Sequence, residues 1–182
     1  MNLPFRWLSL SVLVWSTHTS PVATNGRAAP SRAALYAALA GQWTGTLEYR
    51  DYSRPDTRVT LPTKLSIVYV PDSVAMLMHY VYDDGPGKIV EDDDKFAANA
   101  SVTSVSWGDP KSPSAQQFSV RDVPGAKSPI ALVLQGEGRD NDKPATIRET
   151  FTISRDTLRI LKETRETGGA FAFRHEYVMH RR

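Results

Sequence analysis

The sequence of 182 residues contains no cysteine. This absence excludes a disulfide framework and a lipid-modified N-terminal cysteine. Hydrophobic residues make up 41% of the chain, which is enough for one domain with a core of its own. A folded domain of this sequence must therefore be held together by that core alone.

Dense clusters of one charge sign are also missing. The formal net charge is +2, and it comes closer to neutral if Arg6 is removed with an N-terminal segment. No run of Lys and Arg is long enough to predict contact with a nucleic-acid backbone. We therefore expect no nucleic-acid partner.

The sequence has none of the spacings that hold a metal ion, such as H-x-x-x-H, C-x-x-C or H-E-x-x-H. His79 and His180 are isolated. The acidic run at 91–94 lacks the glycine-punctuated spacing of a calcium loop, and alternate residues of a strand face opposite ways. The run is better interpreted as a solvated face or a rim that repels anions, and residues 140–142 as a loop. We expect no metal and no cofactor.

No hydrophobic run is long enough to cross a membrane as a helix. The apolar run from Trp7 to Trp15, after the single charge of Arg6, is typical of a secretory signal peptide. Residues 1–30 are therefore predicted to be a signal peptide and linker, and residues 31–182 one domain. The protein is expected to be secreted or periplasmic, with no stable membrane anchor; the alternative is a disordered N-terminal tail.

A short amphipathic helix is predicted directly before the first strand. Ser31 is a good N-cap, and residues 32–40 are rich in alanine and leucine. Leu35 and Leu39 lie four apart and so share one face of the helix. Gly41 is placed to end it.

The rest of the chain alternates between apolar and polar residues with the two-residue period of β-strands. Strand segments are expected at 41–50, 58–70, 74–82, 91–96, 101–107, 117–123 and 129–138, followed by three C-terminal strands. Most connections are short enough for hairpins, and closure would protect the edge strands. The predicted fold is all-β: a roughly ten-stranded antiparallel up-and-down β-barrel with a short N-terminal helix.

Two predicted hairpins, with turns at 168–169 and 155–156, fix the register of the last three strands. The expected pairs are Lys162 with His175, Ile160 with Tyr177, Leu158 with Met179, Glu163 with Arg174, Ile153 with Leu158, Phe151 with Ile160, Glu149 with Lys162 and Arg148 with Glu163. One face is then apolar, comprising Ile147, Phe151, Ile153, Leu158, Ile160, Phe173, Tyr177 and Met179. The other face carries Arg148, Glu163 and Arg174, whose charges alternate as cross-strand pairing favours.

One polar row, Glu149–Lys162–His175, falls on the face that should be the interior. It could be an ion pair near the barrel mouth, with Lys162 reaching water, or a polar anchor for a ligand in an apolar pocket. Tyrosines on inward-facing positions would add hydroxyl groups to that pocket. The candidate ligand-binding residues are Glu149, Lys162, His175, Tyr177, Tyr49 and Tyr69.

A short helix followed by Gly41-x-Trp43 at the start of many antiparallel strands resembles the lipocalin and wider calycin pattern. The resemblance implies that Trp43 packs at the closed end of a barrel. It also implies that a basic residue near the last strand, Arg174 or Arg181, lies across the indole. The first strand further resembles nitrobindin-like haem-binding barrels in Gly41, Trp43 and Gly45, but Leu47 stands where those barrels have a third glycine.

The sequence thus predicts an exported β-barrel that binds a small hydrophobic or amphipathic molecule. Three alternatives stay open: an enzyme that uses Glu149, Lys162 or His175 as acid or base, a haem-binding barrel with His175 as ligand, and a structural envelope protein with a filled core. Lys162 beside His175 disfavours a metal centre, because a second cation would be repelled. No catalytic residue is identified.

Overall fold

The computed structural model describes residues 30–54, 56–112, 115–122 and 129–182. The signal peptide predicted within 1–30 lies, but for Pro30, outside the described residues. The elements are α1 (Arg32–Leu39), β1 (Gly41–Arg50), β2 (Arg58–Val70), the 3₁₀ helix η1 (Pro71–Ser73), β3 (Ala75–Asp83), β4 (Ile89–Ala98), β5 (Ser104–Gly108), β6 (Gln116–Asp122), β7 (Ile130–Asp140), β8 (Lys143–Ile153), β9 (Thr157–Arg165) and β10 (Ala172–Arg181).

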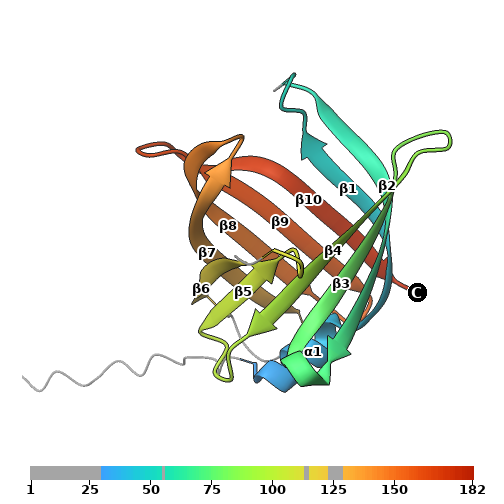
Figure 1. Ribbon diagram of the computed structural model, residues 1–182, viewed down its shortest axis with the longest axis vertical. Coiled ribbons are helices and arrows are strands. Elements are labelled where there is room, and N and C mark those ends of the chain that lie inside the picture. Colours follow the sequence, from blue (N-terminus) through green and yellow to red (C-terminus); the bar gives the residue numbers. More distant parts are fainter. Residues whose placement is uncertain (1–29, 55, 113–114, 123–128) are drawn as a thin grey trace, which may run out of the picture.

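The ten strands form one closed antiparallel barrel (Figure 1). Each strand pairs with the next along the chain, and β10 pairs with β1, so the topology is up-and-down. The prediction of a ten-stranded up-and-down barrel with a short N-terminal helix is confirmed. No helical segment in the described part of the chain has the length and apolarity needed to cross a membrane.

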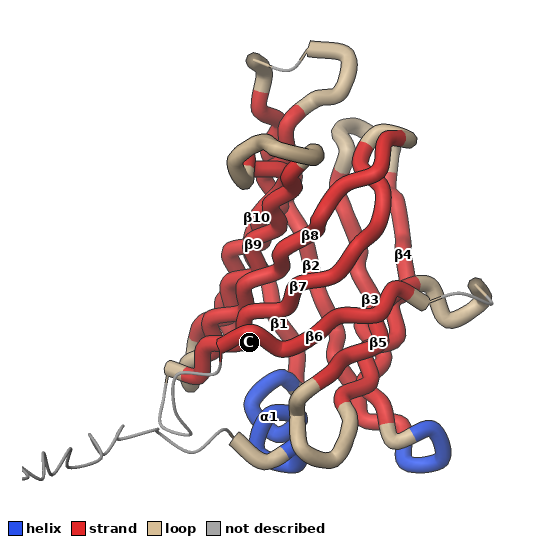
Figure 2. Tube along the Cα trace, turned by 90° about the vertical axis from the view of Figure 1, so that its left-hand side faces the viewer, coloured by secondary structure: helices blue, strands red, loops and turns tan. Residues whose placement is uncertain are grey.

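Helix α1 lies at one end of the barrel (Figure 1 and Figure 2). It begins after Ser31, whose hydroxyl oxygen accepts a hydrogen bond from the Ala34 N–H at 3.2 Å. Leu35 and Leu39 are fully buried, because the apolar face of the helix packs against the end of the barrel core. The indole N–H of Trp43, two residues into β1, donates to the carbonyl of Leu39 at 3.0 Å. This end of the barrel is therefore closed.

Arg181 is the basic residue that lies across Trp43. Its guanidinium carbon is 4.0 Å from the centre of a Trp43 ring, a cation–π contact. The same group donates to the carbonyls of Ala40 at 2.6 Å and Ala38 at 2.9 Å, and so satisfies carbonyls at the end of α1. Of the two candidates, Arg181 and not Arg174 therefore matches the calycin pattern.

The predicted register of the last three strands is confirmed from β8 to β9 and for most of β9 to β10. One predicted pair, Glu163 with Arg174, is wrong. Glu163 pairs with Phe173 instead, and a β-bulge before His175 leaves Arg174 as the extra residue.

The bulge turns Arg174 inward and Phe173 outward. Arg174 is 7% exposed, and its Nε lies 3.2 Å from a carboxylate oxygen of Asp140 and donates to the Tyr52 hydroxyl at 2.7 Å. Phe173 is half-buried beneath the Arg58 guanidinium, 3.7 Å from the ring centre. Phe173 is therefore not part of the interior apolar face.

The barrel wall is uneven, because β5 and β6 are short. The ladder between β4 and β5 begins only at Lys95, so residues 89–94 of β4 pair with β3 on one side and, in the described ladders, with no strand on the other. The ladder between β6 and β7 ends at Gln135. The end of the barrel opposite α1 therefore has less wall between β4 and β7 (Figure 1).

Candidate functional site

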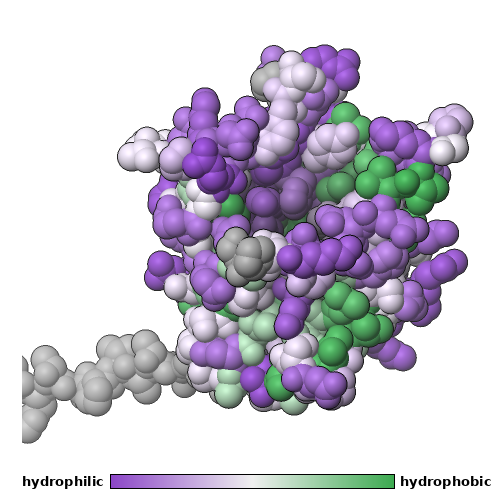
Figure 3. All heavy atoms as spheres, in the orientation of Figure 1, coloured by the Kyte–Doolittle hydropathy of each residue, from purple (hydrophilic) through white to green (hydrophobic). Residues whose placement is uncertain are grey.

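A cavity of about 220 Å³ lies inside the barrel, above the apolar layer that includes Phe96 and Phe151. Its lining comes from β3, β4, β5, β6, β8, β9 and β10. In the space-filling view, this half of the molecule is hollowed, and the floor of the hollow is hydrophilic (Figure 3). The interior is thus apolar toward α1 and polar toward the open end.

The predicted polar row does face this cavity. Glu149 pairs with Lys162, Lys162 pairs with His175, and the Lys162 ammonium lies 3.7 Å from the Glu149 Oε1. Tyr177 lines the same cavity, so Lys162 and Tyr177 share a face. Four of the six candidate ligand-binding residues therefore come together in one site.

The other two candidates, Tyr49 and Tyr69, do not line the cavity. Tyr69 has the inward parity of β2, but it lies near the strand's end, past the closed end of the barrel. Its side chain is 48% exposed and sits 5.8 Å from the ring of Tyr36 on α1. The expectation that Tyr69 contributes to the interior is wrong, because a strand longer than the barrel wall carries its last inward positions outside.

Two carboxyl groups were missing from the candidates. Asp92 and Asp94 of β4 line the cavity, whereas Asp93 faces outward and lies 2.8 Å from the His79 imidazole. Asp92 is nevertheless exposed, so the acidic run at 91–94 is solvated at the rim of the cavity as well as on the outer face. Its two-residue alternation was visible in the sequence, but the height at which β4 crosses the cavity relative to β8 was not.

Glu149 is the most perturbed acid of the site. It is 3% exposed, and its Oε2 is buried with no hydrogen-bond partner among the described residues. Burial raises the pKa of Glu149 to about 8. The charge of Lys162 lowers this pKa, and the nearby carboxyl group of Asp94 raises it further. Much of the Glu149 population therefore carries a proton at neutral pH and can either donate or accept a hydrogen bond.

Asp94 and His175 are shifted by the same burial. Burial, together with the charge of Asp92, raises the pKa of Asp94 to about 6. The buried indole N–H of Trp107 opposes this shift, although it makes no hydrogen bond of good geometry within the described structure. Burial and then Lys162 lower the pKa of His175 to about 3, so its imidazole is neutral at physiological pH.

Three tyrosines form one wall of the cavity. The hydroxyls of Tyr82 and Tyr177 are 2.9 Å apart, and the ring of Tyr80 is 5.9 Å from that of Tyr82 and 5.3 Å from that of Tyr177. Burial raises the pKa of Tyr82 to about 12 and those of Tyr80 and Tyr177 well above the ordinary value. All three hydroxyls are therefore neutral, and the wall combines aromatic surface with polar groups.

The cavity also contains unused donors. Within the described residues, Gln116 Nε2 and Trp107 Nε1 are buried without a hydrogen-bond partner. Both residues line the cavity together with Glu149, whose Oε2 is equally unpartnered. Buried polar atoms without partners are rare in folded proteins, so donors and an acceptor are both free to orient a guest. No three His, Asp or Glu side chains of the described ranges are arranged to hold a metal ion.

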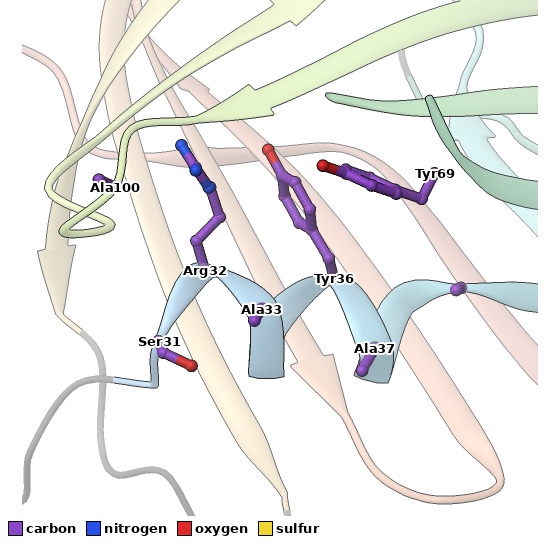
Figure 4. Close-up of a pocket in the computed structure, with 8 residues that line it drawn as sticks. Ser31, Arg32, Ala33, Tyr36, Ala37, Tyr69 and Ala100 are labelled. Carbon is purple, nitrogen blue, oxygen red and sulfur yellow. The ribbon is translucent and has the colours of Figure 1, made fainter. Parts of the chain in front are cut away.

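A second recess, of about 570 Å³, lies outside the barrel beside α1 (Figure 4). Arg32 and Tyr36 rise side by side from the helix, the ring of Tyr36 lies next to that of Tyr69, and the rest of the lining is mainly alanine. Two of the polar groups here already have partners: Tyr36 donates to the Val74 carbonyl at 3.1 Å, and Arg32 to the Ala98 carbonyl at 3.4 Å. The interior cavity is therefore the better candidate site.

Comparison with known proteins finds a likeness in structure and none in sequence. No protein-family model matches the chain, and no curated protein matches it. The structure of the S-type phycobiliprotein lyase CPES from Guillardia theta is similar, with a TM-score of 0.58 and 10% sequence identity over 84% of this chain and 92% of that one. At this identity the likeness shows the fold alone. A likeness to nitrobindin-like barrels is not shown.

Proposed function

We propose that this chain is an exported, lipocalin-like binding protein whose interior cavity holds a small amphipathic molecule. The observation that carries the proposal is the Glu149 Oε2, which is buried in the cavity without a partner among the described residues. A buried acceptor left unsatisfied costs about 1–3 kcal/mol, and a guest that donates to it would remove that cost. The aromatic wall of Tyr80, Tyr82 and Tyr177 supplies the apolar half of an amphipathic site.

Release of a bound molecule tests this proposal. The protein, purified from its own host without denaturation, would be denatured and the released compounds identified by mass spectrometry. We expect one small compound in near-stoichiometric amount. We expect much less of it from Lys162→Met and Glu149→Gln, and an unchanged amount from Glu163→Gln, since Glu163 lies on the outer face beside Arg148. Release of no compound from the wild-type protein would contradict the proposal.

Export is the second part of the proposal, and it rests on the apolar run between Trp7 and Trp15 after Arg6. The intact mass of the protein recovered from its host tests it. A mass that lacks residues from the N-terminal 30 is expected, whereas a full-length chain retained in the cytoplasm would contradict it.

A further inference from the structure

The charge around the cavity has one dominant sign. Three carboxyl groups line it, those of Asp92, Asp94 and Glu149, against the single ammonium group of Lys162. Although much of Glu149 is protonated at neutral pH, the carboxyl groups of Asp92 and Asp94 still outnumber that ammonium group. Arg174 does not alter this balance, because it is already paired with Asp140. The low-dielectric walls of a recess focus such a field, and a cationic guest is favoured over an anionic one.

Glu149 gives an independent reason for a cation. Lys162 approaches only its Oε1, at 3.7 Å, and leaves Oε2 without a partner among the residues that the structure describes. Glu149 is only 3% exposed, so water has little access to hydrogen-bond with this oxygen. A guest with N–H donors would satisfy it, and a positively charged donor would do so most strongly.

The opposite wall suits the body of such a guest. Tyr80, Tyr82 and Tyr177 present aromatic rings against which an apolar or aromatic body can pack. Gln116 Nε2 offers a donor to an acceptor elsewhere on the guest. The volume of about 220 Å³ lies below the roughly 300–1,000 Å³ of sites for drug-sized ligands, so the guest is small.

We propose that the cavity takes a small organic ammonium compound, with its cationic nitrogen beside Asp94 and the Glu149 Oε2 and its apolar body against the three tyrosines. The carboxyl groups of Asp92, Asp94 and Glu149 outweigh the repulsion from Lys162, which approaches Glu149 at its Oε1. A single ring with a short aminoalkyl chain has the right size and chemistry. The inference rests on the proposed function and narrows its ligand class.

Proton release on binding is a consequence of this placement. The groups that act on Glu149 are Lys162 from β9 and Asp94 from β4, and His175 and the tyrosines of β3 and β10 face it as neutral side chains. A bound cation favours the ionised form of Glu149. Because the free protein has a Glu149 pKa of about 8, ammonium binding expels a proton below that pH, and affinity rises from pH 6.5 to 8.

Three probes that differ only in their head group test the inference. Tyramine carries an ammonium, tyrosol a hydroxyl and 4-hydroxyphenylacetate a carboxylate on the same phenol. By titration calorimetry of the full chain at pH 8, tyramine is expected to bind roughly 10-fold or more tightly than either analogue. Equal or tighter binding of tyrosol or 4-hydroxyphenylacetate overturns the ammonium inference and leaves the cavity function standing.

Matched variants locate the binding. Asp94→Asn and Glu149→Gln should each weaken tyramine binding roughly 10- to 100-fold. Asp93→Asn should leave it unchanged, since Asp93 is on the same strand but faces outward. If Glu149→Gln does not fold, Asp94→Asn and the probe series still decide. The inference is overturned if tyramine affinity is unchanged in Asp94→Asn and in any folded Glu149→Gln. It is also overturned if no probe binds to the wild type. The release experiment tests the cavity function separately.

Discussion

Glu149 is buried, forms an ion pair and has one carboxyl oxygen without a partner among the described residues. The position of Glu149 in the sheet explains each of these three properties. Its register opposite Lys162 follows from the turn at 155–156, as the sequence predicted. Its burial follows from its inward parity between Ile147 and Phe151. The unpartnered Oε2 depends on where the strands of the far wall end, which no local pattern encodes.

The stability of the protein should depend on pH through Glu149. Its pKa is about 8 in the folded protein and 4.5 ordinarily, so between these values the folded state holds more protons than the unfolded state. Stability contributed by this group is therefore complete below pH 4.5 and is lost as the pH rises through 8. From pH 6.5 to 8 we expect the free energy of unfolding to fall by up to about 1.4 kcal/mol per pH unit.

Urea denaturation at pH 6.5, 7.25 and 8 measures this slope. Asp94 interferes little in this window, because it titrates at about 6 or below. His175, with a pKa of about 3 in the folded protein and 6.5 ordinarily, adds a small opposing rise in stability that fades by about pH 7.5. The difference between the wild type and the variant therefore isolates the contribution of Glu149. Glu149→Gln is expected to flatten the slope. Identical slopes for the wild type and the variant would show that Glu149 is ionised in the folded protein.

At the scale of the elements, Arg181 joins the end of β10 to the closed end of the barrel. It contacts the Trp43 ring, the carbonyls at the end of α1 and, at 2.8 Å, the carbonyl of Arg155 in the turn after β8. Arg181→Ala is expected to lower the free energy of unfolding by about 2–3 kcal/mol. In Arg155→Ala the change should be under about 0.5 kcal/mol, because that side chain is exposed and only its backbone is used. Equal effects of the two substitutions in urea denaturation would contradict this role.

The bulge in β10 creates a second link, at the opposite end. Arg174 pairs with Asp140, donates to the Arg50 carbonyl and lies 3.3 Å from the centre of the Tyr52 ring, so it ties the loop after β1 to β7. Asp140→Ala leaves a buried cation without its carboxylate and is expected to cost about 3 kcal/mol of stability. Glu137→Ala on the same strand is the control, with an expected change near zero. A loss under about 1 kcal/mol in Asp140→Ala, measured by thermal or urea unfolding, would contradict the pairing.

At the scale of the whole molecule, the two-residue period and the turn residues were enough to predict the number of strands, their order and the closure. The bulge at Arg174 was not predictable, because one extra residue in a strand leaves no mark in composition or turn chemistry. Asp94 was missed because alternation shows which way it points but not that it lies at the height of Glu149 on β8, some fifty residues later in the chain. Tyr69 was misplaced because parity tells which way a side chain points but not where the barrel wall ends.

The central claim is that the polar interior is a ligand site and not a structural feature. A high-resolution crystal structure of the protein as purified from its host tests it most directly. We predict density for a small organic molecule in the cavity, within hydrogen-bond distance of the Glu149 Oε2 and in contact with the ring of Tyr82. A cavity filled by the protein's own side chains, with the Glu149 Oε2 bonded to one of them, would contradict the claim.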